Sequence, residues 1–320
     1  MKFSHLITIL LLAGMLAACS GTADTIAATG TSTTGTAPVS TPTSSGSTDG
    51  VLCDYSDTTF NSQPSLTYTS LSEWTCSGGV RQLAANGIPD HEVGDFPNPN
   101  NPNTIVEQSV SASFTLDPAE TSAVTELGGP RGVTGYVLNG VKIDAATGGS
   151  CDDSGTSCSL AGNAGSWRIE ALGQTSFNFG TDQNNAHVQP DGQYHYHGMP
   201  EGFVAKRGGN ASTMTLIGWA ADGFPIYARY GYRDAVDATS EIIEMIGSYQ
   251  LVTSVSANRP STTDFPLGTF QQDWEFVAGS GDLDECNGRY GVTPEFPDGI
   301  YHYYATDTYP YFQRCVKGDL

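Results

Sequence analysis

Two closely spaced histidines, His195 and His197, offer the clearest candidate chemistry in this 320-residue sequence. They lie in a tyrosine-rich segment, residues 190–197, which reads PDGQYHYH. Pro-Asp-Gly is typical of a turn, and the residues that follow it have the composition of a β-strand. Alternate side chains of a strand point to the same face, so the two imidazoles would share one face. Neutral imidazoles at this spacing suit a single zinc or copper ion.

A second segment, residues 297–304, reads PDGIYHYY and repeats this pattern. Aligning the two segments places His302 at the first histidine position and Tyr304 at the second. If the segments pair or lie near each other, three imidazoles converge. The predicted metal ligands are therefore His195, His197 and His302, with His187 or His91 as a further ligand.

Several oxygen-bearing side chains could complete such a site or supply acid–base chemistry beside it. The candidate oxygen ligands are Tyr304, Asp182 and Asp191, and the candidate acids or bases are Asp90, Asp191, Asp222 and Asp298. Each of these four aspartates also lies where a turn favours aspartate. Histidines on aromatic strands can equally hold loops together through hydrogen bonds.

Two classes of function stay open on these residues. One is a metal-dependent enzyme, an oxidase or a hydrolase, in which the metal activates oxygen or water. The other is a non-catalytic surface module that binds a metal, a glycan or a protein, and in which the histidines can be purely structural. The sequence contains no Gly-x-Ser-x-Gly, phosphate-binding loop or His-Glu-x-x-His motif.

Charge excludes one further class of partner. The chain has 34 acidic and 13 basic residues, a formal net charge of −21. It lacks the basic surplus that phosphate backbones require, so we expect no nucleic-acid partner.

The elements that position the histidines are predicted to be short strands. Three apolar or alternating runs between turn residues indicate strands, at 109–116, 135–143 and 214–220. One helix is expected over Asp237 to Ile246, from polar starting residues and three spaced isoleucines. The sequence contains 38 glycines and 17 prolines, and it shows no long run of apolar residues at helical spacing. The predicted fold is mainly β with little helix, a single domain of packed antiparallel sheets.

Six cysteines follow Cys19, an even number that indicates disulfides in an exported chain. Fifteen pairings are possible in principle, and nearest-neighbour pairing is the most economical. It joins Cys53 to Cys76, Cys151 to Cys158 and Cys286 to Cys315.

The N-terminus indicates export and a lipid anchor. Residues 1–19 combine Lys2, a short apolar stretch and the ending LAAC, which resembles the bacterial lipobox, whose cysteine is acylated. Residues 20–50 are almost wholly Ser, Thr, Gly, Ala and Pro, and this composition predicts a disordered tether. We expect a membrane partner through Cys19 and a place in the cell envelope. Ser20 resembles the signal that sends Gram-negative lipoproteins to the outer membrane.

Residues 51–320 resemble the YHYH domain family, named for the tetrapeptide found here at 194–197. The resemblance rests on four blocks: NGIPDH (86–91), QPDGQYHYHG (189–198), ADGFPIYARYGY (221–232) and GDLDECNGRYGVTPEFPDGIYHYYATDTYPYF (281–312). It implies an exported bacterial protein, and it carries over no established catalytic residue. The second copy here ends in tyrosine, so a symmetric four-histidine site is excluded.

Overall fold

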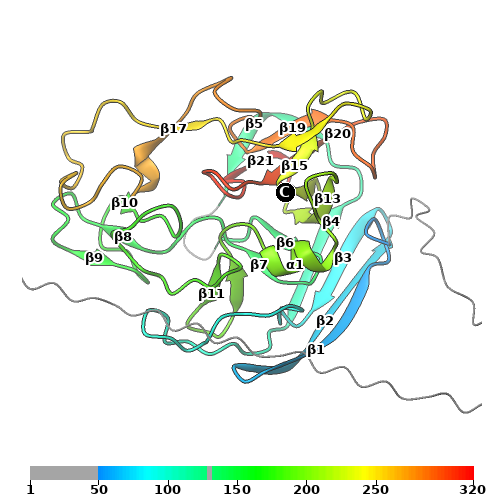
Figure 1. Cartoon of the computed structure of the whole chain (residues 1–320), viewed down its shortest axis with the longest axis horizontal. Coiled ribbons are helices and arrows are strands. Elements are labelled where there is room, and N and C mark those ends of the chain that lie inside the picture. Colours follow the sequence, from blue (N-terminus) through cyan, green and yellow to red (C-terminus); the bar gives the residue numbers. More distant parts are fainter. Residues whose placement is uncertain (1–49, 128–131) are drawn as a thin grey trace, which may run out of the picture. The chain divides into compact units, whose positions relative to one another are not determined.

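The computed structural model describes residues 50–127 and 132–320. The predicted signal segment, its Cys19 and nearly all of the tether lie outside these ranges. As predicted, the chain is mainly β, and its helices are one short α-helix and one 3₁₀ turn within the described residues (Figure 1). None of the helices there is long and apolar enough to cross a membrane.

An eight-stranded mixed sheet forms the centre of the fold. Its strand order is β11-β12-β7-β6-β13-β14-β20-β19, and only the pairs β12–β7 and β14–β20 are parallel. The bounds are β6 Gly135–Val137, β7 Lys142–Ile143, β11 Ala186–Val188, β12 Tyr194–Tyr196, β13 Thr215–Ala220, β14 Pro225–Ala228, β19 Gly288–Gly291 and β20 Ile300–Ala305. Most residues of these strands are buried, so apolar and aromatic side chains occupy both faces of the sheet. The strands also carry buried polar side chains, among them Lys142, His195 and His302.

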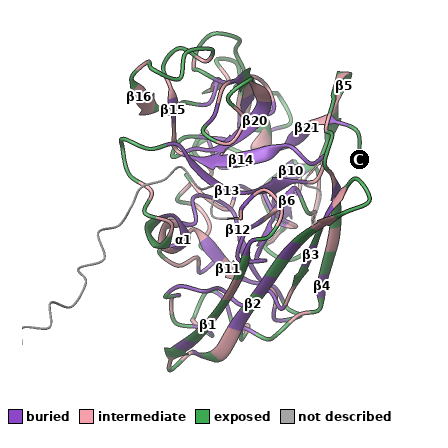
Figure 2. Cartoon of the chain, turned by 90° about the vertical axis from the view of Figure 1, so that its right-hand side faces the viewer, coloured by how far each residue is buried: buried purple, intermediate pink, exposed green. Residues whose placement is uncertain are grey.

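A four-stranded antiparallel sheet packs beside the central one (Figure 2). Its strands are β1 Ser56–Gln63, β2 Leu66–Ser77, β3 Val80–Ala85 and β4 Val110–Thr115. Buried and exposed residues largely alternate along β2, as expected for a sheet with one solvated face. Trp74, fully buried, donates from Nε1 to the Leu138 carbonyl at 2.7 Å and so ties the two sheets together. The prediction of packed sheets is confirmed.

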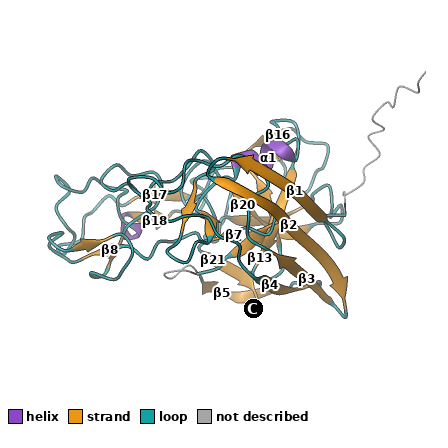
Figure 3. Cartoon of the chain, turned by 90° about the horizontal axis from the view of Figure 1, so that it is seen from below, coloured by secondary structure: helices purple, strands orange, loops and turns teal. Residues whose placement is uncertain are grey.

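Short ladders and loops complete the domain. Figure 3 shows β8, β17 and β18 grouped at one end, where loop predominates over strand. The remaining elements are β5 Glu120–Glu126, β8 Ser150–Cys151, β9 Cys158–Ser159, β10 Trp167–Arg168, α1 Glu201–Lys206, β15 Tyr230–Tyr232, β16 Ile242–Glu244, β17 Tyr249–Leu251, the 3₁₀ turn Gln271–Asp273, β18 Trp274–Phe276 and β21 Cys315–Gly318. A small second core, built on Cys151, Trp167, Ile169, Phe179 and Phe270, stabilises this end.

The helix expected over Asp237 to Ile246 is wrong. Asp237 instead forms a turn, in which its carboxylate accepts from the backbone N–H of Thr239 at 2.8 Å. Ile242 and the residues after it form β16, which pairs with β15. Aspartate and threonine bond to their local backbone in turns, and β-branched isoleucines favour strands, so these local preferences override the helical spacing.

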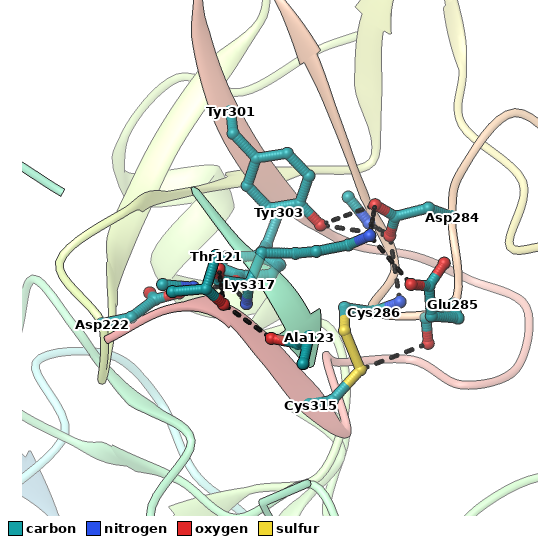
Figure 4. The surroundings of a disulfide bond; sticks show 12 residues. Thr121, Ala123, Asp222, Asp284, Glu285, Cys286, Tyr301, Tyr303, Cys315 and Lys317 are labelled. Atoms are coloured by element: carbon teal, nitrogen blue, oxygen red, sulfur yellow. Dashed lines mark hydrogen bonds and ion pairs between the residues drawn. A yellow bond between two sulfur atoms is a disulfide. The ribbon is translucent and has the colours of Figure 1, made fainter. Parts of the chain in front are cut away.

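The three disulfides have the predicted nearest-neighbour pairing, Cys53–Cys76, Cys151–Cys158 and Cys286–Cys315. The third joins the loop before β19 to β21, close to the Lys317 ammonium (Figure 4).

Candidate metal centre

Three histidines meet on the β11–β12 hairpin at one edge of the central sheet. His187 of β11 lies directly opposite His195 of β12, and His197 follows two residues later. Strand alternation therefore places all three imidazoles on one face. Tyr194 and Tyr196 point to the opposite face, where Asp182 and Asn139 bond to their hydroxyls.

The three Nε2 atoms converge. His197 Nε2 lies 3.0 Å from His195 Nε2 and 3.1 Å from His187 Nε2. Two nitrogens that share a tetrahedral metal with bonds of about 2.0–2.1 Å lie about 3.3 Å apart. The two contacts of His197 are a few tenths of an ångström shorter than this, and the ligand nitrogens of the three histidines all lie within 4.8 Å of one another, so a rearrangement of the side chains would let one ion bind all three imidazoles.

Hydrogen bonding at the outer ring nitrogens determines which Nε2 atoms can carry a proton and which carry a lone pair. His187 Nδ1 donates to the Phe179 carbonyl at 2.8 Å, and His195 Nδ1 donates to the Gln193 carbonyl at 3.2 Å. A neutral imidazole has a single N–H, so Nε2 of both rings carries a lone pair. His197 Nε2 can donate to only one of them. At least one of the two short contacts therefore brings two lone pairs together, an arrangement that a bound cation would satisfy.

Burial keeps these imidazoles neutral. His195 is 1% exposed and His197 is 2% exposed. Desolvation lowers the pKa of His187 and lowers the pKa of His195 and His197 well below the ordinary value of 6.5. Neutral imidazole is the form that binds metal. Adding a proton to an Nε2 atom would relieve the contact between two lone pairs, but burial disfavours this charged form.

A cavity of about 270 Å³ borders the cluster, and all three histidines line it. Its apolar wall includes Leu160 and Phe179. Asp144 and Asn101 also line it, and the Oδ1 atom of each is buried and has no hydrogen-bond partner within 50–127 and 132–320. The other carboxylate oxygen, Asp144 Oδ2, pairs with the Lys142 ammonium at 3.1 Å. Two residues that line the cavity thus each hold a buried acceptor oxygen without a partner.

His302 does not join this cluster, which corrects the predicted ligand set. It lies on β20, five strand positions from β12 in the central sheet, or about 24 Å at the usual strand spacing. Its Nδ1 donates to the Ile300 carbonyl at 2.9 Å, and its Nε2 accepts from the Tyr304 hydroxyl at 2.9 Å. Both ring nitrogens are satisfied by protein groups, unlike those of the three-histidine cluster.

His91 also lies apart from the cluster, on the tyrosine face of β12. Its Nδ1 contacts the Glu92 carbonyl, and its Nε2 contacts the Tyr196 hydroxyl. It anchors the loop of residues 86–91 to the sheet. Of the two alternatives for a further ligand, the structure brings His187 to the cluster and leaves His91 out.

The predicted oxygen groups also lie elsewhere. Tyr304 lies beside His302, Asp182 accepts from Tyr194 on the opposite face, and Asp191 is exposed in the Pro-Asp-Gly turn. Of the other candidate acids and bases, Asp90 pairs with Lys206 and Asp222 accepts from Tyr303, whereas Asp298 is exposed in the second Pro-Asp-Gly turn. Asp144 and Asn101 were missed, because only their place in the folded chain sets them beside the histidines.

Because His302 is buried and neutral, it should make stability depend on pH. Burial lowers its pKa from 6.5 to about 4. Between these values the unfolded chain binds a proton that the folded chain does not, so stability falls as the pH falls through this window. The full effect is about 3 kcal/mol below pH 4. Urea unfolding in EDTA should show the stability advantage of wild type over His302→Gln shrinking from pH 7.5 to 4.5. If the stability difference between wild type and His302→Gln stays the same from pH 7.5 to 4.5, the predicted effect of His302 is contradicted.

Comparison with known proteins identifies a family. A family model described as "YHYH protein" matches residues 111–318. It therefore covers the central sheet and the histidine cluster and begins within β4, so the block at 86–91 lies outside it. No curated protein and no solved structure matches the chain.

Proposed function

The chain belongs to the YHYH protein family, and we propose that the tetrapeptide which names this family forms a transition-metal centre here. The proposed ligands are His187, His195 and His197. The observation that carries the proposal is the pair of short Nε2 contacts, at 3.0 and 3.1 Å, among buried imidazoles of which two direct lone pairs inward. Outer N–H groups bound to backbone carbonyls are the usual support of metal-ligating histidines.

The proposed ion is copper or zinc. Both favour imidazole, and no thiolate competes, because the six cysteines after Cys19 form disulfides. Three protein ligands with a position open to a cavity are typical of reactive metal sites, whereas structural zinc sites are closed by four protein ligands. Such an ion supplies Lewis acidity, or with copper also redox chemistry, to a molecule held in the cavity.

The cavity indicates what kind of molecule that is. The volume of about 270 Å³ fits a small molecule and is too small for a folded partner. Asp144 Oδ1 and Asn101 Oδ1 would accept hydrogen bonds from its N–H or O–H groups. The proposed function is therefore a metal centre that binds and activates a small, hydrogen-bond-donating molecule.

The test is a titration of tag-free apo-protein with Co(II) and with Cu(II), followed by azide. We expect one equivalent of metal per chain, with the ligand-field spectrum of a nitrogen-rich site, and a spectral change when azide takes the open position. Uptake without an azide response would show a closed, structural site. No stoichiometric uptake would return the histidines to a structural role in a glycan- or protein-binding module.

We also propose that this centre acts in the cell envelope, on a lipid anchor at Cys19. The support is the LAAC ending at residues 16–19 and the low-complexity segment after it. About thirty flexible residues span roughly 30 Å on average, enough to hold a domain clear of a membrane surface.

Replacing the anchor cysteine should change where the protein fractionates. We expect Cys19→Ala to move the protein from the membrane pellet to the soluble fraction and to abolish labelling by a fatty acid, because acyl chains on one residue give the attachment. Ser20→Asp, which keeps the cysteine, serves as the control and should stay membrane-bound. Persistence of Cys19→Ala in the pellet would exclude the lipid anchor.

A further inference from the structure

The two halves of the central sheet have the same topology. Outward from the centre, one half runs β6, β7, β12, β11 and the other β13, β14, β20, β19. In each half a hairpin is followed by a parallel strand and then by an antiparallel edge strand. The halves join through antiparallel β6 and β13, where Tyr136 lies opposite Trp219 at the centre of the pairing. A local two-fold axis therefore relates them.

Equivalent turns carry equivalent bonds. In the first hairpin Asn139 Oδ1 accepts from the backbone N–H of Val141 at 3.1 Å, and in the second Asp222 Oδ1 accepts from Phe224 at 3.3 Å. The glycine inside each turn has φ of +78° and +89°, the left-handed region that glycine adopts freely. The sequences NGVKI and DGFPI thus occupy one structural position.

The tyrosines of the two YHY segments also match. Tyr194 donates to Asp182 at 2.8 Å, and Tyr301 donates to Asp284 at 2.9 Å (Figure 4). Each aspartate lies four residues before the first residue of its edge strand, Ala186 or Gly288. The second tyrosines, Tyr196 and Tyr303, bond to the turn residues Asn139 and Asp222, which are themselves equivalent.

The loops before the edge strands repeat down to their backbone conformation. Asn185 and Asn287 have positive φ values of 55° and 61°, which non-glycine residues seldom adopt. Their carbonyls accept from the backbone N–H of His197 and of Tyr304, respectively. This detail places Tyr304 in register with His197.

This register identifies, for each histidine of the cluster, the residue at the equivalent position in the second half of the sheet. His302 is equivalent to His195, and their Nδ1 atoms bond to the equivalent carbonyls of Ile300 and Gln193. Opposite His302 on the edge strand lies Arg289, just as His187 lies opposite His195. The second half thus has His302, Tyr304 and Arg289 where the first half has three histidines.

In the second half, His302 Nε2 has a protein partner and needs no metal. Tyr304 supplies the proton that His302 Nε2 accepts, and an Arg289 N–H lies 3.5 Å from the Tyr304 hydroxyl. The Arg289 guanidinium carbon lies 5.6 Å from the centre of the Tyr304 ring. A guanidinium has no lone pair to offer a metal, and its positive charge repels one.

We propose that the second half of the sheet holds a latent site for a divalent transition metal, centred on His302 and closed by Tyr304 and Arg289. Replacing both by histidine would recreate the three-imidazole arrangement on the equivalent hairpin. The inference rests on the proposed function in one respect, because it takes the arrangement of His187, His195 and His197 as the arrangement that binds a metal. It also implies that the native chain, despite two YHY segments, binds one ion and not two.

The test measures Co(II) per chain for the Arg289→His/Tyr304→His variant, tag-free, in two backgrounds. In the native background we expect the Arg289→His/Tyr304→His variant to bind two equivalents of Co(II) per chain and the wild type to bind one. In the His195→Ala/His197→Ala background we expect one equivalent of Co(II) with the two added histidines and none without them. The bound Co(II) should show an imidazole-rich ligand-field spectrum. Arg289→Gln/Tyr304→Phe is the matched control, since it removes the charge and the phenol without adding imidazoles, and it should gain no metal.

The two backgrounds separate this inference from the proposed function. Metal on the recreated site but none on the native cluster would contradict the proposed function and leave the latent site standing. A folded double variant that gains no cobalt in either background would overturn the latent site. If the double variant does not fold, Arg289→His alone keeps the bond between Tyr304 and His302, and we expect weaker second-site uptake. Absence of that uptake in the folded single variant would likewise overturn it.

Discussion

Replacing His195 by alanine is expected to weaken metal binding at least about 100-fold, whereas the same substitution at His302 should leave affinity unchanged. Loss of a supporting residue alone costs about 10–100-fold in known metal sites, and loss of a ligand removes a metal–nitrogen bond as well. The structure makes His302 an unusually well matched control. It is the symmetry equivalent of His195, it is buried to the same degree, and its Nδ1 makes the same kind of bond.

The measurement is a competition titration of apo-protein against a chromophoric chelator at pH 7.5, for wild type and both variants. His187→Ala and His197→Ala should behave as His195→Ala does, because the ligand nitrogens of all three lie within 4.8 Å of one another. Near-UV circular dichroism establishes that each variant is folded. Equal affinities for the His195 and His302 variants would remove the basis for the metal centre.

The histidine pair at 195 and 197 could be predicted from sequence because strand alternation is a local rule. The third histidine of the cluster was not singled out, because that choice depends on which strand pairs with β12. His187 stands eight residues before His195, across the Pro-Asp-Gly turn, and a hairpin interpretation of that turn would have chosen it. The repeated segment directed the prediction to His302 instead. Similarity between the segments reflects the two-fold relation of the halves, which keeps them apart in the sheet.

The fold shows the same division between local and long-range information. Strands expected at 109–116 and 214–220 appear as β4 and β13, and the run at 135–143 appears as the β6–β7 hairpin. The order of strands in the central sheet, and with it the cavity wall that includes Asn101 and Asp144, depends on contacts between residues far apart in the chain. Sequence patterns of short period carry no information on those contacts.

Removing the carboxylate of Glu170 should cost about 3–5 kcal/mol of stability, because it leaves the Arg314 guanidinium buried without a counter-charge. The two side chains are 3% and 7% exposed, and their closest atoms are 2.8 Å apart. Glu170 also accepts from the Tyr309 hydroxyl at 3.1 Å. Its neighbour Ile169 accepts from Thr147, which lines the cavity beside the histidines. The ion pair therefore supports the wall of the proposed binding site.

Urea unfolding of Glu170→Met, Arg314→Met and the double variant measures this. We expect each single variant to lose several kcal/mol and to melt about 10 °C lower, given about 2–4 °C per kcal/mol for domains approaching this size. The double variant should recover most of the loss, since two apolar side chains of similar length remove both charges together. Glu241→Met serves as an exposed control, because Arg233 and Glu241 pair with side chains 61% and 69% exposed, and it should cost no more than about 1 kcal/mol. If Glu170→Met costs as little as that control, solvent already screens the Arg314 charge and the pair contributes no more than a surface one. If the double variant stays as unstable as the singles, the loss comes from the Tyr309 bond and local packing and not from the uncompensated guanidinium.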